Sequence, residues 1–155
     1  MTASPEKSSE APPRSNEIVL RLIAVLALVG VIVSAISLQR HYAKSATEFC
    51  DFNQKFSCDI VNRSEYSSIM GIPVAGVGIA GYAVLFVLST FRKSHAETPN
   101  QLLGAAIAGL GFAGYLTYIE AYVLMTWCIL CLISLLLIFL ISVFGAIIKL
   151  KDAAA

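Results

Sequence analysis

Four long apolar runs constrain the fold of this chain more than any other feature. They cover residues 18–38, 69–91, 102–125 and 127–148. Within these runs only Arg21 and Glu120 carry a charge. A helix needs about 20 residues to cross roughly 30 Å of hydrocarbon, and each run approaches or exceeds that length. The pattern predicts an all-α membrane protein built as a bundle of four transmembrane helices.

Composition supports this class and argues against others. The chain is 57% hydrophobic and 14% charged, and its apolar residues are gathered into blocks, which an ordinary soluble domain does not show. It has no acidic or basic tract of the kind that binds nucleic acid. We therefore expect lipid, and no nucleic acid, among its partners.

Polar segments divide the chain between and beyond the runs. Residues 1–17 are rich in Ser, Pro, Ala and Glu and predict a disordered tail, because they cannot bury enough apolar surface to fold. Residues 39–68 form a long outer loop, and residues 149–155 form a second tail. The first run exceeds the core of a signal peptide, so an uncleaved helix is expected. The third and fourth runs are joined so tightly that they predict an antiparallel hairpin.

The positive charges predict the orientation. With four spans, one side holds seven and the other four: Lys7, Arg14, Arg21, Arg92, Lys93, Lys149 and Lys151 against Arg40, Lys44, Lys55 and Arg63. An excess of Lys and Arg marks the cytoplasmic side, so both tails are predicted to be cytoplasmic. All four cysteines then lie on the opposite side, which is oxidising in bacteria and in the endoplasmic reticulum.

The four cysteines fall into two pairs, Cys50 with Cys58 and Cys128 with Cys131. The second pair is a Cys-x-x-Cys at the start of the fourth run, where a helix N-terminus favours a thiolate at Cys128. A disulfide within so short a loop removes little chain entropy, so the pair is more typical of a redox centre than of a structural staple. Zinc fits poorly with the wide first pair and the oxidising compartment, and no metal is expected. The placement suggests electrons passing between water-borne thiols and an acceptor dissolved in lipid.

Glu120 is a further candidate, because an ionisable residue in a membrane helix is usually functional. It lies near the outer end of the third run, five residues before the hairpin. The alternative is that it reaches the interface or bonds to Tyr118 or Tyr122. We retain it as a possible supporting residue.

The order of these motifs resembles the vitamin K epoxide reductase family over about residues 18–148. The motifs are Cys50-x7-Cys58, Ser64, Gly71-Ile72-Pro73 and Trp127-Cys128-Ile129-Leu130-Cys131. The resemblance implies an enzyme: a four-helix bundle around a quinone of the ubiquinone, menaquinone or vitamin K type, with an extracytoplasmic loop and half-helix cap.

The same resemblance implies roles for single residues. Cys131 would contact the quinone, Cys128 would exchange with Cys58, and Cys50 would meet a thioredoxin-fold, DsbA-like protein acting in trans. Ser64 matches a serine of the family's loop helix. The implied reaction is a membrane thiol:quinone oxidoreduction that reoxidises the disulfide-forming partner and supports disulfide bond formation. The implied site is the periplasmic face of a bacterial cytoplasmic (inner) membrane.

Three alternatives stay open from the sequence. Reduction of vitamin K epoxide or vitamin K quinone is the first alternative, and it ranks behind the thiol oxidase because animal members of the family carry a tyrosine four residues after the last cysteine, where this chain has Leu135. The DsbB type also spans four times, but its Cys-x-x-Cys comes first. A non-enzymatic four-helix membrane subunit with structural disulfides is the third.

Overall fold

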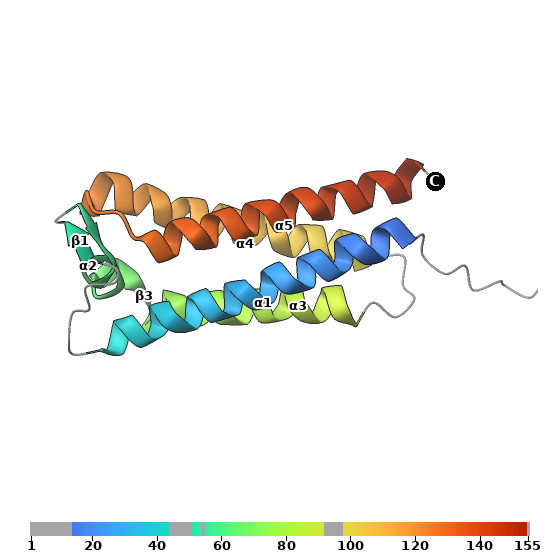
Figure 1. Cartoon of the computed structure of the whole chain (residues 1–155). Helices are drawn as coiled ribbons and strands as arrows, with labels where there is room; N and C mark the ends of the chain where they lie inside the picture. The colour runs from blue at the N-terminus through green and yellow to red at the C-terminus, as the bar shows by residue number, and fades with distance from the viewer. Residues whose placement is uncertain (1–13, 44–50, 54, 92–97, 155) are drawn as a thin grey trace, which may run out of the picture.

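Four long helices form a bundle in the computed structural model, which describes residues 14–43, 51–53, 55–91 and 98–154 (Figure 1). The helices are α1 (Arg14–Tyr42), α3 (Val74–Thr90), α4 (Thr98–Ile119) and α5 (Ile129–Ala154). Helix α1 packs against α3 and α5, and α4 packs against the same two helices, so the four close into a ring. The predicted all-α bundle is therefore confirmed at the level of its helices.

Three helical stretches in the described part of the chain are long and apolar enough to cross a membrane: Asn16–Tyr42, Pro99–Leu124 and Ile129–Ala154. Helix α3 is apolar but has 17 residues, about 25 Å at 1.5 Å per residue, which is the lower limit for a span. Large apolar side chains such as Ile18, Val25 and Leu136 are exposed, which suits contact with lipid. The chain is a membrane protein, and a fourth span through α3 stays a prediction.

A tight hairpin explains why α3 begins five residues after the start of the predicted span 69–91. Strands β3 (Ser68–Ile69) and β4 (Ile72–Pro73) pair antiparallel. Met70 and Gly71 form the turn with φ of 53° and 83°, and positive φ at both central residues is typical of a two-residue hairpin. Pro73 then directly precedes the helix at φ −62°, so its missing N–H costs no helical bond.

The tails also differ from the prediction. Residues 14–17 of the predicted disordered tail 1–17 belong to α1, because Asn16 is buried and donates from Nδ2 to Asp152 Oδ1 at 3.0 Å. Residues 149–154 of the other tail continue α5. Residues 1–13 and 155 lie outside the described part of the chain.

Short elements from the outer loop gather at one end of the bundle (Figure 1). Strands β1 (Asp51–Asn53) and β2 (Phe56–Ser57) form a hairpin, followed by helix α2 (Cys58–Asn62) and the 3-10 helix η1 (Glu65–Ser67). The Ser57 side chain caps α2 by accepting the Ile60 N–H at 3.3 Å. We call β1, β2, α2 and η1 the loop layer. Helix α2 packs against α1, so this layer rests on the bundle.

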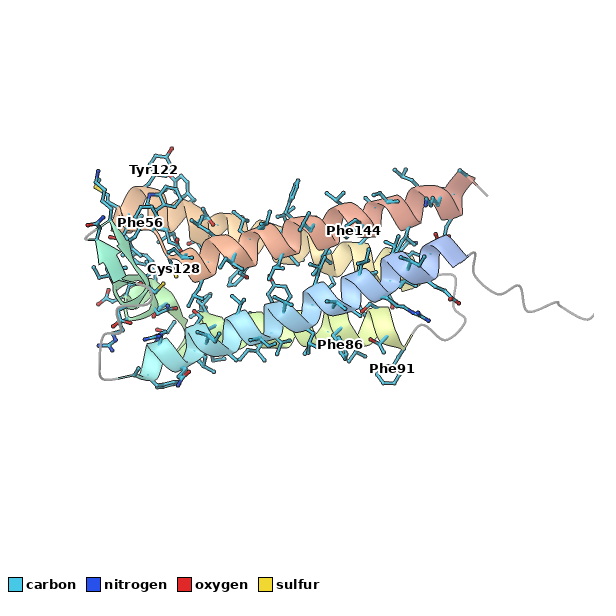
Figure 2. The ribbon with its side chains drawn as sticks, in the orientation of Figure 1. Phe56, Phe86, Phe91, Tyr122, Cys128 and Phe144 are labelled. Carbon is cyan, nitrogen blue, oxygen red and sulfur yellow. The ribbon has the colours of Figure 1, made fainter. Side chains whose placement is uncertain are left out.

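The loop layer is bonded to the α4–α5 connection. The Trp127 N–H donates to the Lys55 carbonyl at 2.8 Å, and Phe56 forms a parallel bridge with Trp127. Figure 2 shows Phe56 and Cys128 at the same end of the bundle, with Phe86 and Phe91 toward the other. The connection itself is the π-helical turn η2 (Glu120–Leu124) followed by Met125, which reverses the chain at φ 49°.

Candidate functional site

Cys128 and Cys131 lie at the start of α5, as predicted, and both are free thiols. Cys128 immediately precedes the helix, and its carbonyl already accepts the Leu132 N–H at 3.0 Å. Cys131 is on the first turn and half-buried, while Cys128 is 0% exposed. The cap position gives Cys128 a side-chain direction that the regular helix does not impose.

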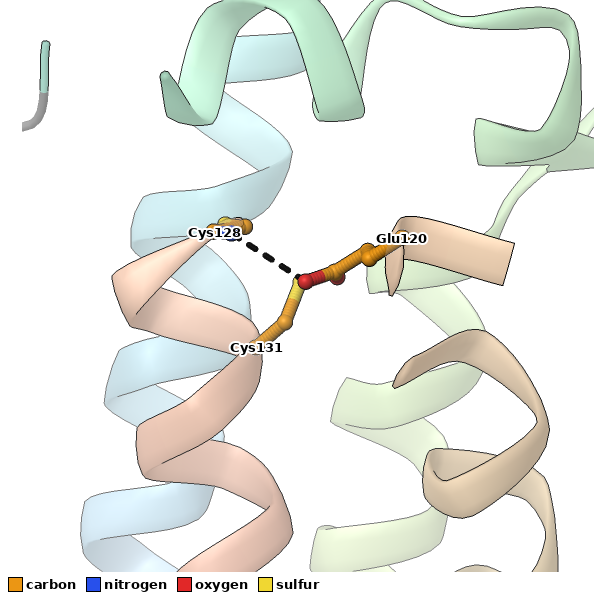
Figure 3. Close-up of side chains that lie close together, drawn as sticks. All are labelled: Glu120, Cys128 and Cys131. Carbon is orange, nitrogen blue, oxygen red and sulfur yellow. Dashed lines mark hydrogen bonds between the residues drawn. The ribbon is translucent and has the colours of Figure 1, made fainter. Parts of the chain in front are cut away.

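Glu120 lies directly beside the two thiols (Figure 3). Its Oε2 accepts the backbone N–H of Cys128 at 3.1 Å. One carboxylate oxygen and the two sulfur atoms all lie within 4.8 Å of one another. Glu120 is 2% exposed, so it does not reach the interface, which was the alternative considered from the sequence. Tyr118 and Tyr122 are exposed and contact each other, with ring centroids 4.8 Å apart.

The turn η2 explains the position of Glu120. A π-helical turn shifts the register of an α-helix and is common at functional sites. The N–H groups of Met125 and Thr126 both donate to the Glu120 carbonyl, the second at 3.2 Å. Backbone and side chain of Glu120 therefore both hold the connection that leads into the cysteine pair.

A cavity of about 500 Å³ lies between the helices under the loop layer. Its walls are mostly apolar side chains of α1, α3, α4 and α5, with a few polar groups such as Ser37, His41 and Asn62. Cys131 and Glu120 line it, whereas Cys128 is not among its lining residues. An apolar cavity of this size with few polar groups is typical of a small-molecule site.

The environment of Cys128 favours its thiolate. The Cys131 thiol lowers the pKa of Cys128 by hydrogen bonding, and backbone N–H groups of the first turn add to this. Burial and the nearby Glu120 charge act in the opposite direction, but the net pKa is lowered. The direction agrees with the prediction from the helix N-terminus, although the thiol neighbour is the largest cause.

Cys58 lies next to the helix pair although it is 70 residues earlier in the chain than Cys128. It is disulfide-bonded and 0% exposed, and it belongs to one buried cluster with Val61, Cys128 and Leu130. Cys50 lies outside the described residues. The structure thus brings three of the four predicted cysteines together, since Cys131 packs against the cluster that holds Cys58 and Cys128.

Ser64 has a local role in the loop layer. Its hydroxyl donates to the Val61 carbonyl at 2.8 Å, and its own carbonyl accepts from the Ser67 N–H at 3.0 Å. It is absent from the residues that line the cavity. These bonds shape the turn between α2 and η1, and a direct part in chemistry stays a prediction.

Asn62 is a site residue that the sequence analysis missed. Its Oδ1 accepts the Ser37 hydroxyl at 2.6 Å, its Nδ2 donates to the Cys58 carbonyl at 2.9 Å, and its carbonyl is 2.5 Å from His41 Nδ1. It therefore ties the Cys58 segment to α1 at the edge of the cavity. Its spacing of four residues from Cys58 is the signal that could have pointed to a shared helical face.

One carboxylate oxygen of Glu120 and the sulfur atoms of Cys128 and Cys131 lie within 4.8 Å of one another, a spacing that does not by itself exclude a metal ion. Two thiolates and a carboxylate suit zinc. The expected absence of a metal therefore stays a prediction.

Two comparisons with known proteins bear on this site. The family model described as the vitamin K epoxide reductase family matches residues 21–146, which include all four cysteines and Glu120. A search of curated proteins finds no match.

Proposed function

Because this chain belongs to the vitamin K epoxide reductase family, whose members are quinone-linked thiol oxidoreductases, we propose that it reoxidises a thioredoxin-fold, disulfide-forming protein. The electrons pass through the two cysteine pairs to a membrane quinone. The partner is DsbA-like and acts in trans, and the quinone is of the ubiquinone, menaquinone or vitamin K type.

One observation carries this proposal: the helix pair lies between the apolar cavity and the cluster that contains Cys58. Cys128 belongs to that buried cluster, and Cys131 packs against the cluster and also lines the cavity. A pair that borders both a lipid-like cavity and a disulfide-bonded cysteine suits electron transfer between them. The free state of the pair also argues against two structural disulfides.

The proposed relay assigns each cysteine one step. The partner's first thiolate attacks the loop disulfide at Cys50 and releases Cys58; the partner's second thiolate then resolves that mixed disulfide, which oxidises the partner and releases Cys50. The Cys58 thiolate attacks Cys128 of a disulfide between Cys128 and Cys131, which forms a Cys58–Cys128 mixed disulfide and releases Cys131. Cys50 then attacks Cys58, which restores the loop disulfide and releases Cys128, so the helix pair ends as a dithiol. A quinone bound in the cavity would supply the oxidant for this dithiol, because quinones are stronger oxidants than protein disulfides.

We place this activity at the periplasmic face of a bacterial inner membrane. The excess of Lys and Arg on the side of the two tails supports this orientation. Cys58, Cys128 and Cys131 lie at one end of the bundle with the loop layer, so a single face serves both pairs.

Anaerobic quinone reduction by the purified protein tests the proposal. A reduced thioredoxin-fold protein serves as donor, and the loss of quinone absorbance is followed. We expect turnover by the native chain and none by Cys131→Ala, with Leu132→Ala as the matched control on the same turn. A native chain that oxidises no dithiol donor in the presence of any of the three quinone types contradicts the proposal.

A further inference from the structure

We propose that Glu120 carries a proton from the helix cysteine pair to the quinone during oxidation of the pair. The inference rests on the proposed function and adds a residue to its chemistry. Glu120 is the one acidic side chain that lines the described cavity, and it is next to both reacting sulfur atoms.

Burial and hydrogen bonding leave one carboxylate oxygen able to take this proton. Oε2 accepts the Cys128 N–H, whereas the buried Oε1 has no hydrogen-bond partner among the described residues. A buried polar atom without a partner is costly, and binding a proton changes this oxygen from an unpaired acceptor into a donor. One Glu120 carboxylate oxygen lies within 4.8 Å of the Cys131 sulfur, so a rotation of the carboxyl group or one bridging water brings the proton-accepting oxygen to that thiol.

Electrons and protons balance in the proposed oxidation of the helix pair. Cys128 reacts as the thiolate and Cys131 as the thiol, so forming their S–S bond releases one proton and two electrons. The quinone takes both electrons and two protons and becomes the hydroquinone. Glu120 accepts the Cys131 proton and gives it to a quinone oxygen, since both residues line the same cavity. The second proton comes from water at the outer face.

A purely structural role is the competing explanation, because the Glu120 side chain also holds the Cys128 N–H. Glu120→Gln separates the two roles. The glutamine oxygen still accepts that N–H, but the amide carries no proton between partners. The test uses the Cys50→Ala, Cys58→Ala background, in which a small permeant dithiol supplies electrons and only the helix pair reacts.

Other titratable groups must be considered in any pH profile. Those that face Glu120 or line the same cavity are Cys128, Cys131, His41, Tyr66 and Tyr82. No Lys or Arg is among the described lining residues. Histidine is the side-chain type that most often changes charge near neutral pH, so a His41→Gln version of each protein is measured in parallel.

If the proposal holds, Glu120→Gln increases the thiolate fraction of the helix pair but decreases the rate of quinone reduction. The ultraviolet absorbance of the thiolate, read without quinone, should appear at lower pH in Glu120→Gln, because the Glu120 charge raises the pKa of Cys128. Quinone reduction at neutral pH should nevertheless be at least about 10²-fold slower, the lower end of the usual contribution of a positioned proton carrier. More thiolate with a lower rate is the signature of a lost proton carrier.

Failure of the Glu120 role and failure of the proposed function give different results. An unchanged or faster rate in Glu120→Gln, with correct folding, overturns the role of Glu120 and leaves the proposed function intact. If the native pair fails to reduce quinone at all, as Cys131→Ala does, the proposed function fails and Glu120 with it.

A second measurement applies if Glu120→Gln does not fold. In the protein that retains Glu120, the rate should fall with acid more steeply than the thiolate absorbance, because both the thiolate and the carboxylate are lost. This steeper fall of the rate with acid should also occur in the His41→Gln version. A rate that follows the thiolate fraction alone overturns the proposal.

Discussion

Replacing Gly30 by alanine should destabilise the bundle at a known point of contact. Helix α1 approaches α3 closely here, and a Cβ at residue 30 would lie 2.4, 2.5 and 2.6 Å from Cδ1, Cε1 and Cγ of Tyr82. Carbon atoms normally approach to about 3.5–4.0 Å, so the ring must move by about 1 Å or more. Tyr82 is buried in the core, so a shift of its ring disturbs the side chains packed around it.

The displacement also breaks polar contacts. The Tyr82 hydroxyl lies 2.8 Å from the Ser134 carbonyl, to which it donates, and 2.9 Å from the Ser134 hydroxyl. Overpacking by one methyl typically costs about 1–3 kcal/mol, and a lost hydrogen bond adds about 1 kcal/mol. We expect Gly30→Ala to lower the free energy of unfolding by about 2–4 kcal/mol. Because Tyr82 and Ser134 line the cavity, quinone reduction should fall as well.

Unfolding in detergent micelles by a denaturing detergent measures this change. Gly76→Ala is the matched control, since nothing lies within 4 Å of a Cβ at residue 76 and alanine favours a helix. Tyr82→Phe keeps the ring and removes the hydroxyl, so it should lower the free energy of unfolding only by about 1 kcal/mol, the contribution of the lost hydrogen bond. If Gly30→Ala unfolds like the native chain, or Gly76→Ala loses as much, the close contact is not as described.

Two further predictions concern the relay. A membrane-impermeant thiol reagent should label reduced Cys50 in intact cells, because the charge bias puts the outer loop outside the cytoplasm; labelling only after lysis reverses the orientation. A Cys50→Ala, Cys131→Ala variant should accumulate a disulfide between Cys58 and Cys128, since removal of both resolving thiols leaves two sulfurs in one buried cluster. Peptide mapping without reduction detects that bond, and two thiols that stay free under mild oxidation contradict the exchange.

The sequence predicts the helices and the cysteine pair well because those features are local. Apolar runs set the helices, and the Cys-x-x-Cys spacing places two thiols at the start of α5. The hairpin at 68–73 was not predictable in the same way. Ile69, Met70 and Ile72 are as apolar as a helix requires, but positive φ at Met70 and Gly71 turns the chain there.

The direction in which Glu120 points was beyond sequence reasoning for a different reason. Position in the chain placed it near the outer end of its helix, where either the interface or the interior was within reach. The π-helical turn that begins at Glu120, and the left-handed Met125 after it, decide between them. Both depend on how α4 meets α5, which is a tertiary property. The grouping of Cys58 and Cys128 in one buried cluster is likewise long-range and has no local signal.

The two-sided arrangement of the helix cysteines follows from the place where α5 begins. Two residues three apart inside a regular helix lie on nearly the same face and would both point into the cavity. Here Cys128 is the residue before the helix, so its side chain is released from that face and is buried in the cluster that contains Cys58, while Cys131 lines the cavity and packs against the same cluster. The N–H of Cys128 is held by Glu120, which fixes the residue at which the helix starts. The Glu120 carboxylate therefore sets both the direction of the Cys128 thiol and the polar edge of the cavity. A variant that lengthens α5 by one turn at this end should abolish disulfide exchange with the loop pair, even with all four cysteines present.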